Sequence, residues 1–285
     1  RDRSPSRGLG DVYKRQVAIN QWEQAEDSMY TLCGKDRIHP STDGHLVMAY
    51  LFLKAQGLAG KPVADIRIDG AGKKVTRSDN CRVSDLSVSS DNLTFTYEAK
   101  SLPYPIDTSY YDNEKHTQAD ALSVIPFMDE MNYEGLSVSG LSDGYYGLTI
   151  GREFIGRFTA RELERGINMA LLQNTPQYKQ AMKIRQMNEE RWLKERKMRE
   201  FYWVEYNLMR KTGMLWACNE AAVDTLRKYR PHDIFLQWNG DLWLQYMHKG
   251  IREDCVNEQQ DLVNQIYEQN KPIPLRIEIK KFTDL

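Results

Sequence analysis

The stretch Asp36-Arg37-Ile38-His39-Pro40, which leads directly into a helical pattern over residues 43–56, decides how this chain is interpreted. An aspartate three residues before a histidine, ahead of a helix, can supply two of the three members of a hydrolytic triad. The third member, a nucleophile on a strand-to-helix turn, is expected upstream. Little sequence precedes Asp36, so we expect the nucleophile to lie outside this chain.

Both side chains suit hydrolytic chemistry. His39 can act as a general base because a neutral imidazole titrates near working pH. Asp36 would orient the ring and stabilise the imidazolium that forms when His39 takes a proton. Pro40 disfavours helical geometry at His39, so the pair is expected in a loop. The alternative is that Asp36 and His39 only flank a helix N-terminus, with Asp43 near its dipole.

The helix after this loop is amphipathic, with Ser41 or Thr42 as its cap and Gly57 as its terminator. Its apolar face is formed by Leu46, Ala49, Tyr50 and Leu53. Without the sheet of a complete domain, this face is expected to stay exposed, to dock on a neighbouring domain or to self-associate. Residues 17–58 are therefore expected to be the least stable part of the chain.

The run DRIHPSTDGHLVMAYLFLKAQG (residues 36–57) resembles the final conserved block of SGNH hydrolases, also called GDSL esterases. There, an Asp-x-x-His-Pro loop leads into the last helix of a flavodoxin-like domain. The resemblance implies that Asp36 and His39 are the triad acid and base of a serine ester hydrolase that needs no cofactor. The family's serine lies in a G-D-S block, and a Gly and an Asn complete its oxyanion hole; none of these blocks is present here. Residues 101–107 and 140–176 more weakly resemble the region that follows this domain in some bacterial SGNH proteins.

The first residues are expected to lie outside the fold. Residues 6–16, SRGLGDVYKRQ, resemble the translation of a sequencing adapter, and the natural protein is expected to enter near Val17. A basic, disordered N-terminal arm is the alternative. The predicted organisation is residues 1–16 adapter-derived or disordered, 17–58 the end of an SGNH domain, 59–158 an accessory β-sandwich, and 159–285 a helical region with a C-terminal strand.

Composition excludes several classes of protein. The 285 residues carry a formal charge of −1, and residues 1–16 hold five basic and two acidic groups, which leaves 34 basic and 38 acidic groups elsewhere. This balance argues against a protein whose main partner is nucleic acid. The four cysteines, at positions 33, 81, 218 and 255, have no metal-ligand spacing, and no apolar run is long enough to span a membrane.

Residues 60–159 alternate between apolar and polar with period two, as in Ala64-Asp65-Ile66-Arg67-Ile68. Turn signals such as Asp69-Gly70 separate these runs. The pattern predicts a small antiparallel sandwich, interrupted by one short helix near residues 117–124. With the preceding segment, the fold class is an α/β remnant followed by an antiparallel β-sandwich and a helical region.

The chain becomes helical after Thr159. Thr159 and Glu162 form a capping box for a helix to about Leu172, and Thr175-Pro176 starts a helix that could run to about Lys211. Further helices are expected near residues 219–229 and 254–269. The alternation of Leu275, Ile277 and Ile279 with polar residues predicts a final strand that returns to the sandwich.

Other candidate sites have simpler explanations. Ser142 fits a G-x-S-x-G pattern but lies between two strand-like runs, so hairpin chemistry is favoured over a nucleophile elbow. The basic run of residues 179–211 is interpreted as a solvated helix face rather than a nucleic-acid stripe. The aromatic residues near the C-terminus are expected in a core rather than a sugar-binding platform; they are Trp238, Trp243 and Tyr246. The other histidines are assigned surface or core roles; they are His45, His116, His232 and His248.

The sequence thus predicts part of an SGNH-type serine esterase acting on a small-molecule or polysaccharide ester, with an acyl ester of a carbohydrate favoured by analogy with enzymes that carry accessory sandwiches. This chain, which lacks the nucleophile, is predicted to be inactive. No metal, cofactor or nucleic-acid partner is expected, and a periplasmic or secreted location is suspected. The alternative is a noncatalytic binding or docking module formed by the sandwich and helices.

Overall fold

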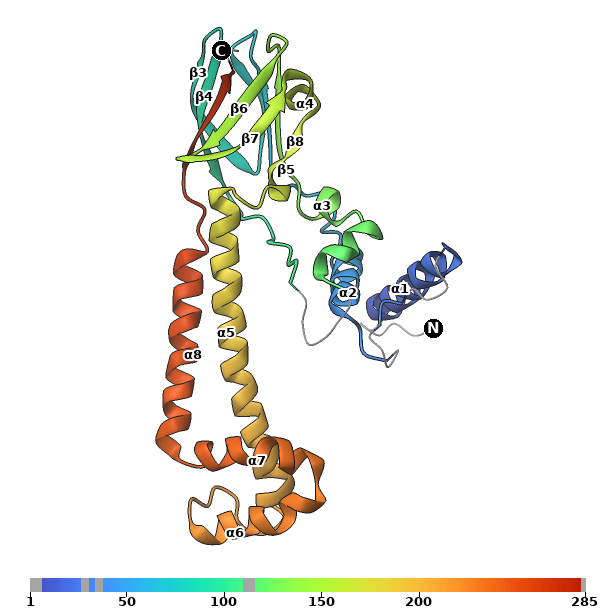
Figure 1. Cartoon of the computed structure of the whole chain (residues 1–285), viewed down its shortest axis with the longest axis vertical. Helices are drawn as coiled ribbons and strands as arrows, with labels where there is room; N and C mark the ends of the chain where they lie inside the picture. Colours follow the sequence, from blue (N-terminus) through green and yellow to red (C-terminus); the bar gives the residue numbers. More distant parts are fainter. Residues whose placement is uncertain (1–6, 27–30, 34–37, 110–115, 283–285) are drawn as a thin grey trace. The chain divides into compact units, whose positions relative to one another are not determined.

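The computed structural model describes residues 7–26, 31–33, 38–109 and 116–282. The chain divides into two compact units: residues 1–181 together with 271–285, and residues 182–270. The first unit contains two β-sheets and several helices, and the second is helical, so the architecture is mixed α/β (Figure 1).

The first sheet has the strand order β2-β1-β5-β8. Its members are β1 (Ala64–Asp69), β2 (Lys74–Asp79), β5 (Glu134–Ser139) and β8 (Ile167–Asn168). β1 and β2 form an antiparallel hairpin, whereas β1 and β5 pair in parallel. The expectation of a purely antiparallel arrangement is therefore wrong. A parallel pair requires a long crossover, and the chain between β1 and β5 supplies one.

The second sheet is antiparallel, with the order β3-β4-β9-β6-β7. Its strands are β3 (Cys81–Val88), β4 (Asn92–Ala99), β6 (Tyr145–Ile150), β7 (Glu153–Thr159) and β9 (Leu275–Lys281). The last strand of the chain lies between β4 and β6, which confirms that the C-terminus returns to the sheets (Figure 1). Its alternating apolar residues enter the core because successive side chains in a strand point to opposite faces.

Both sheets contribute to one hydrophobic core. Ile66 and Leu136 from the first sheet, and Phe95, Leu148 and Ile277 from the second, are all fully buried in this core. β7 leads into α4 (Ala160–Arg165), whose capping box between Thr159 and Glu162 is confirmed. α4 ends well before the predicted Leu172 because Gly166 takes a φ of +94°, a left-handed conformation that favours glycine.

A smaller hydrophobic cluster forms around the helix that follows His39. It contains α1 (Arg7–Glu26), α2 (Thr42–Ala55), the 3₁₀ helices η1 (Gln118–Ser123) and η2 (Met169–Leu171), and α3 (Phe127–Glu130). η1 confirms the short helix expected near residues 117–124. Leu46, Val47, Tyr50 and Leu51 of α2 pack with side chains of η1 and α3, so this helix buries an apolar face within its own unit. The predicted face is wrong in part, because Ala49 is exposed while Val47 and Leu51 are buried.

The structure places residues 7–16 in α1, although the sequence predicted that they lie outside the fold. No proline occurs between Pro5 and Pro40, so nothing in the covalent chain prevents a helix there. Ile19 of this helix packs against the hydrophobic cluster that contains α2. The adapter origin of residues 6–16 stays a prediction.

The second unit is built on α5 (Pro176–Val204), which begins in the first unit and continues without a break to a π-helix, η3 (Glu205–Met209). It is completed by α6 (Glu220–Tyr229), the 3₁₀ helix η4 (Arg230–His232), α7 (Ile234–Tyr246) and α8 (Lys249–Gln269). Its core includes Phe201, Leu226 and Trp243. α7 was not predicted as a helix, although Trp243 and Tyr246 are buried as expected; Trp238 is 67% exposed, which is contrary to expectation.

A search of the described helices finds none that is both long and apolar enough to cross a membrane. Among those residues there is also no group of three or more His, Cys, Asp or Glu side chains that could hold a metal ion.

Candidate functional site

The segment around His39 is closed at both ends by backbone contacts. Cys33 and Pro40 form an isolated antiparallel bridge, so the chain leaves and returns at one point. The carbonyl of Leu32 accepts hydrogen bonds from the backbone N–H of Ser41 at 3.1 Å and from its hydroxyl at 3.2 Å. These contacts fix residues 32–33 against residues 40–41 at the start of α2.

Asp43 and Gly44 stabilise this closure. Asp43 is 2% exposed, and its Oδ1 accepts from the Gly44 N–H at 2.8 Å and lies within hydrogen-bond distance of the Ser41 hydroxyl. A Cβ at position 44 would lie only 2.0 Å from the Leu32 carbonyl oxygen. Glycine is thus required because the backbone of Leu32 approaches the first turn of α2 so closely. A glycine inside a helical pattern was the sequence signal for this approach.

His39 itself is exposed. Asp36, its predicted partner, lies outside the described residues. The structure therefore places the base of the predicted dyad, and the Asp36–His39 contact stays a prediction.

A second Asp–His pair was not predicted. Nδ1 of His116 lies 3.8 Å from Oδ2 of the buried Asp43. The sequence assigned His116 no partner because the two residues are far apart in the chain, and no local pattern connects them. The pair adds a half-exposed imidazole to the contacts of the buried Asp43.

α2 is held in place at its other end as well. Lys54 forms an ion pair with Glu130 of α3 at 2.7 Å, and the Tyr50 hydroxyl donates to the same carboxylate at 2.8 Å. The hydrogen bond from Lys54, followed by that from Tyr50, lowers the pKa of Glu130. α2, which follows His39, is therefore held by contacts at both of its ends.

Ser142 does not have the surroundings of a nucleophile. It lies between β5 and β6, and its hydroxyl contacts Tyr146 Oη at 3.1 Å and Lys281 Nζ at 2.7 Å. Its neighbours in the structure are therefore a phenol and an ammonium rather than a histidine. The G-x-S-x-G match is therefore not a nucleophile elbow between a strand and a helix. The predicted hairpin is wrong, because β5 and β6 belong to different sheets.

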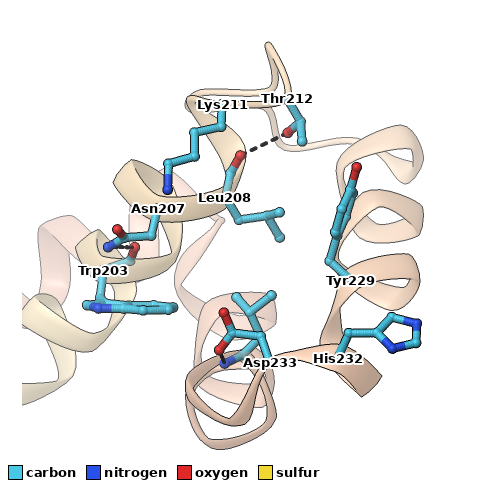
Figure 2. A pocket seen from close by; sticks show the side chains of 9 residues that line it. Trp203, Asn207, Leu208, Lys211, Thr212, Tyr229, His232 and Asp233 are labelled. Atoms are coloured by element: carbon cyan, nitrogen blue, oxygen red, sulfur yellow. Dashed lines mark hydrogen bonds between the residues drawn. The ribbon is translucent and has the colours of Figure 1, made fainter.

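The second unit contains a separate pocket of about 360 Å³ between the end of α5 and the α6–α7 corner (Figure 2). Thr212 and Asp233 line it, and the Thr212 hydroxyl and one oxygen of Asp233 are occupied in local structure. The Thr212 hydroxyl donates to the Leu208 carbonyl, and Asp233 caps α7 by accepting from the Phe235 and Leu236 N–H groups. Figure 2 shows the ring of His232 turned away from the open space. The described side chains here thus suit binding better than acyl transfer.

Comparisons with known proteins place both units in context. Residues 182–271 match the family described as the diltiazem deacetylase C-terminal helical domain. The chain is similar to a solved structure described as BT4096, a gut microbial diltiazem-metabolizing enzyme, with a TM-score of 0.89 and 41% sequence identity. The similarity covers 94% of this chain and 61% of that one, so this chain spans about three fifths of its relative's length. A search of curated proteins finds no match.

Proposed function

We propose that this chain is the C-terminal part of an SGNH-type serine hydrolase that cleaves an ester of a small molecule. The observation that carries the proposal is the pair of backbone contacts Cys33–Pro40 and Leu32–Ser41, which hold the chain beside the exposed His39 at the start of α2. The similarity to a diltiazem-metabolizing enzyme, at 41% identity over nearly the whole chain, supports the same class of reaction.

In this proposal His39 is the general base and Asp36 orients it. A serine from the part of the protein that precedes this chain would lose its hydroxyl proton to His39 as its oxygen attacks the acyl carbon. The protonated His39 would then donate to the departing alcohol, leaving an acyl-enzyme. Water, deprotonated by the same imidazole, would release the acid and restore the serine. No step requires a metal or an organic cofactor.

The substrate class follows from the relatives rather than from a pocket around His39. The matched family is named for a deacetylase, and the similar structure is named for diltiazem, so an acetyl ester of a small molecule is the substrate we propose. This replaces the carbohydrate ester that accessory domains alone had favoured. The two sheets, which share one core, would then form an accessory β-sandwich beside the catalytic domain.

The test compares this chain with a complete protein that includes the preceding sequence, recovered by long-read sequencing of the source DNA. The complete protein should hydrolyse p-nitrophenyl acetate, and this chain alone should not. His39→Ala in the complete protein should lower kcat by about a thousandfold or more. His45→Ala is the matched control, because His45 is also exposed and lies one turn into α2.

Three outcomes would contradict the proposal. The first is hydrolysis by this chain alone that disappears in His39→Ala, and the second is equal activity of the two histidine variants in the complete protein. The third is an upstream sequence without a G-D-S strand-to-helix turn, which would favour a noncatalytic binding module.

A further inference from the structure

The pocket of the helical unit combines apolar walls with two opposite charges. Trp203, Leu208, Tyr229 and Leu236 supply the walls (Figure 2). Trp203 is fixed by its contact with Phe235, at 5.2 Å between ring centroids. The volume of about 360 Å³ lies at the small end of the range for ligand pockets, which fits a compound of amino-acid size.

The charges belong to Lys211 and Asp233, which line the same space. Among the described residues, Lys211 forms no ion pair, and Asp233 forms none with Lys211 or with any other cation. One oxygen of Asp233, Oδ1, accepts from Phe235 N at 2.8 Å and Leu236 N at 3.2 Å. The other oxygen has no hydrogen bond to a described residue. An ammonium and a carboxylate oxygen thus remain available to a ligand.

We propose that this pocket binds a small zwitterion with an apolar body, the chemistry of a hydrophobic α-amino acid. The ligand carboxylate pairs with Lys211, the ligand ammonium pairs with Asp233, and the side chain lies against Trp203, Leu208 and Tyr229. A ligand with only one charge would form only one of these two pairings, so a zwitterion is the preferred ligand. The pocket lies wholly within residues 203–236, so binding needs neither His39 nor the missing serine.

Three probes with the same phenyl body test this assignment on the full chain by calorimetric titration. L-phenylalanine carries both charges, 3-phenylpropanoate lacks the ammonium, and 2-phenylethylammonium lacks the carboxylate. L-phenylalanine should bind at least about fivefold more tightly than either of the others, because each of them loses one charged hydrogen bond.

Two variants assign each charge to its partner. Lys211→Met should weaken the binding of L-phenylalanine and of 3-phenylpropanoate by about fivefold and leave the binding of 2-phenylethylammonium unchanged. Asp233→Asn should weaken the binding of L-phenylalanine and 2-phenylethylammonium and leave that of 3-phenylpropanoate unchanged. Asparagine is as good a helix cap as aspartate, so α7 should stay folded in this variant.

Trp203→Leu tests the apolar wall and should weaken all three probes, since each carries the same ring. Trp238→Leu is its matched control, because Trp238 also packs on Phe235 but does not line the pocket. Lys249→Met, an exposed lysine of the same unit, is the control for Lys211→Met. Neither control should change any affinity.

The proposal is overturned if L-phenylalanine shows no saturable binding, or if it binds no better than the two singly charged probes. It is also overturned if Lys211→Met and Asp233→Asn weaken all three probes equally, or if the controls weaken binding as much as the pocket variants. Circular dichroism of each variant, matching that of the parent, excludes unfolding as the cause of lost binding.

Discussion

The two-sheet core and the helical unit each bury one glutamate, and they satisfy it differently. Glu134 of β5 is fully buried, and its Oε1 accepts from the Tyr97 hydroxyl at 2.8 Å and Gln177 Nε2 at 3.2 Å. Its Oε2 has no hydrogen-bond partner. Glu205 of the π-helix is 1% exposed, and each of its oxygens accepts at 2.8 Å, Oε1 from the Trp243 indole and Oε2 from the Trp216 backbone N–H.

The number and placement of donors decide how each carboxylate behaves. Burial outweighs the two hydrogen bonds at Glu134 and raises its pKa to about 7. The side-chain oxygen of Gln177 is also buried without a hydrogen-bond partner. A proton on Glu134 adds a donor to this buried contact. We therefore expect the packing of β5 against the start of α5 to depend on pH near neutrality.

Glu205 instead fixes a strained backbone. Trp216 has a φ of +62°, a conformation that bulky residues rarely adopt, and its N–H is held by the Glu205 carboxylate. The π-helix that carries Glu205 is itself an uncommon geometry, often found where a side chain must be re-aimed. Here the carboxylate stabilises a particular chain path in the helical unit.

Removal of the Glu205 side chain should therefore have the largest effect. Glu205→Ala leaves the buried Trp243 indole N–H and the Trp216 N–H without acceptors, and we expect it to destabilise the helical unit by about 4 kcal/mol. Urea unfolding followed by tryptophan fluorescence reports on this unit, since five of the six tryptophans lie in residues 182–270. Glu253→Ala, which removes an exposed carboxylate of α8, is the control. Equal losses of unfolding free energy in the two variants would show that the buried contacts of Glu205 do not stabilise the helical unit.

Glu134 should make the two-sheet core less stable as the pH rises. Its pKa is higher in the folded chain, about 7, than the ordinary 4.5, so the folded state holds the proton more tightly. The stabilisation that comes from this bound proton is fully present below about pH 4.5, declines between about pH 4.5 and 7, and is absent above about pH 7. A shift of about 2.5 pKa units corresponds to about 3 kcal/mol. Urea unfolding followed by circular dichroism across this range measures it.

Glu134→Gln is the matched variant, because glutamine keeps the shape and always carries a donor. It should abolish this part of the pH dependence and be more stable than the parent by about 2 kcal/mol at about pH 8. The difference between the two proteins cancels the opposite contributions of carboxylates with lowered pKa, such as Glu130 and Glu162. Parallel pH profiles for parent and variant would show that Glu134 does not titrate in this range.

The contacts of Glu134 and Glu205 also show what the sequence could not predict. Period two in β1, β4, β6 and β9, and the capping box at Thr159, are local patterns, and the structure confirms them. The parallel pairing of β1 with β5, the Glu134–Gln177 contact and the Asp43–His116 pair join distant segments, which no local pattern specifies. At the candidate site, the sequence predicted His39 in a loop but not the closure by Leu32 and Ser41, because that closure depends on backbone approach.

Tyr97→Phe should give a smaller, pH-dependent loss. The Tyr97 hydroxyl favours the charged form of Glu134, so its removal should raise the pKa of Glu134 further. We expect Tyr97→Phe to lower the free energy of unfolding by about 1 kcal/mol more at about pH 8 than at about pH 5. Tyr146→Phe is the control, since Tyr146 is equally buried in the same core but donates to the Ser142 carbonyl. The Tyr146→Phe variant should lose a similar amount of unfolding free energy, and this loss should not depend on pH.

The smallest effect should come from Glu98, which follows Tyr97 directly on β4 but points to the other face of the sheet. Its carboxylate pairs with Arg82 of β3, and the side chains are 38% and 74% exposed. An exposed pair gains little because water screens it, so Glu98→Ala should cost less than about 0.5 kcal/mol in the same urea unfolding assay. A loss as large as that of Glu205→Ala would mean that burial and donor placement do not separate structural carboxylates from surface ones in this chain.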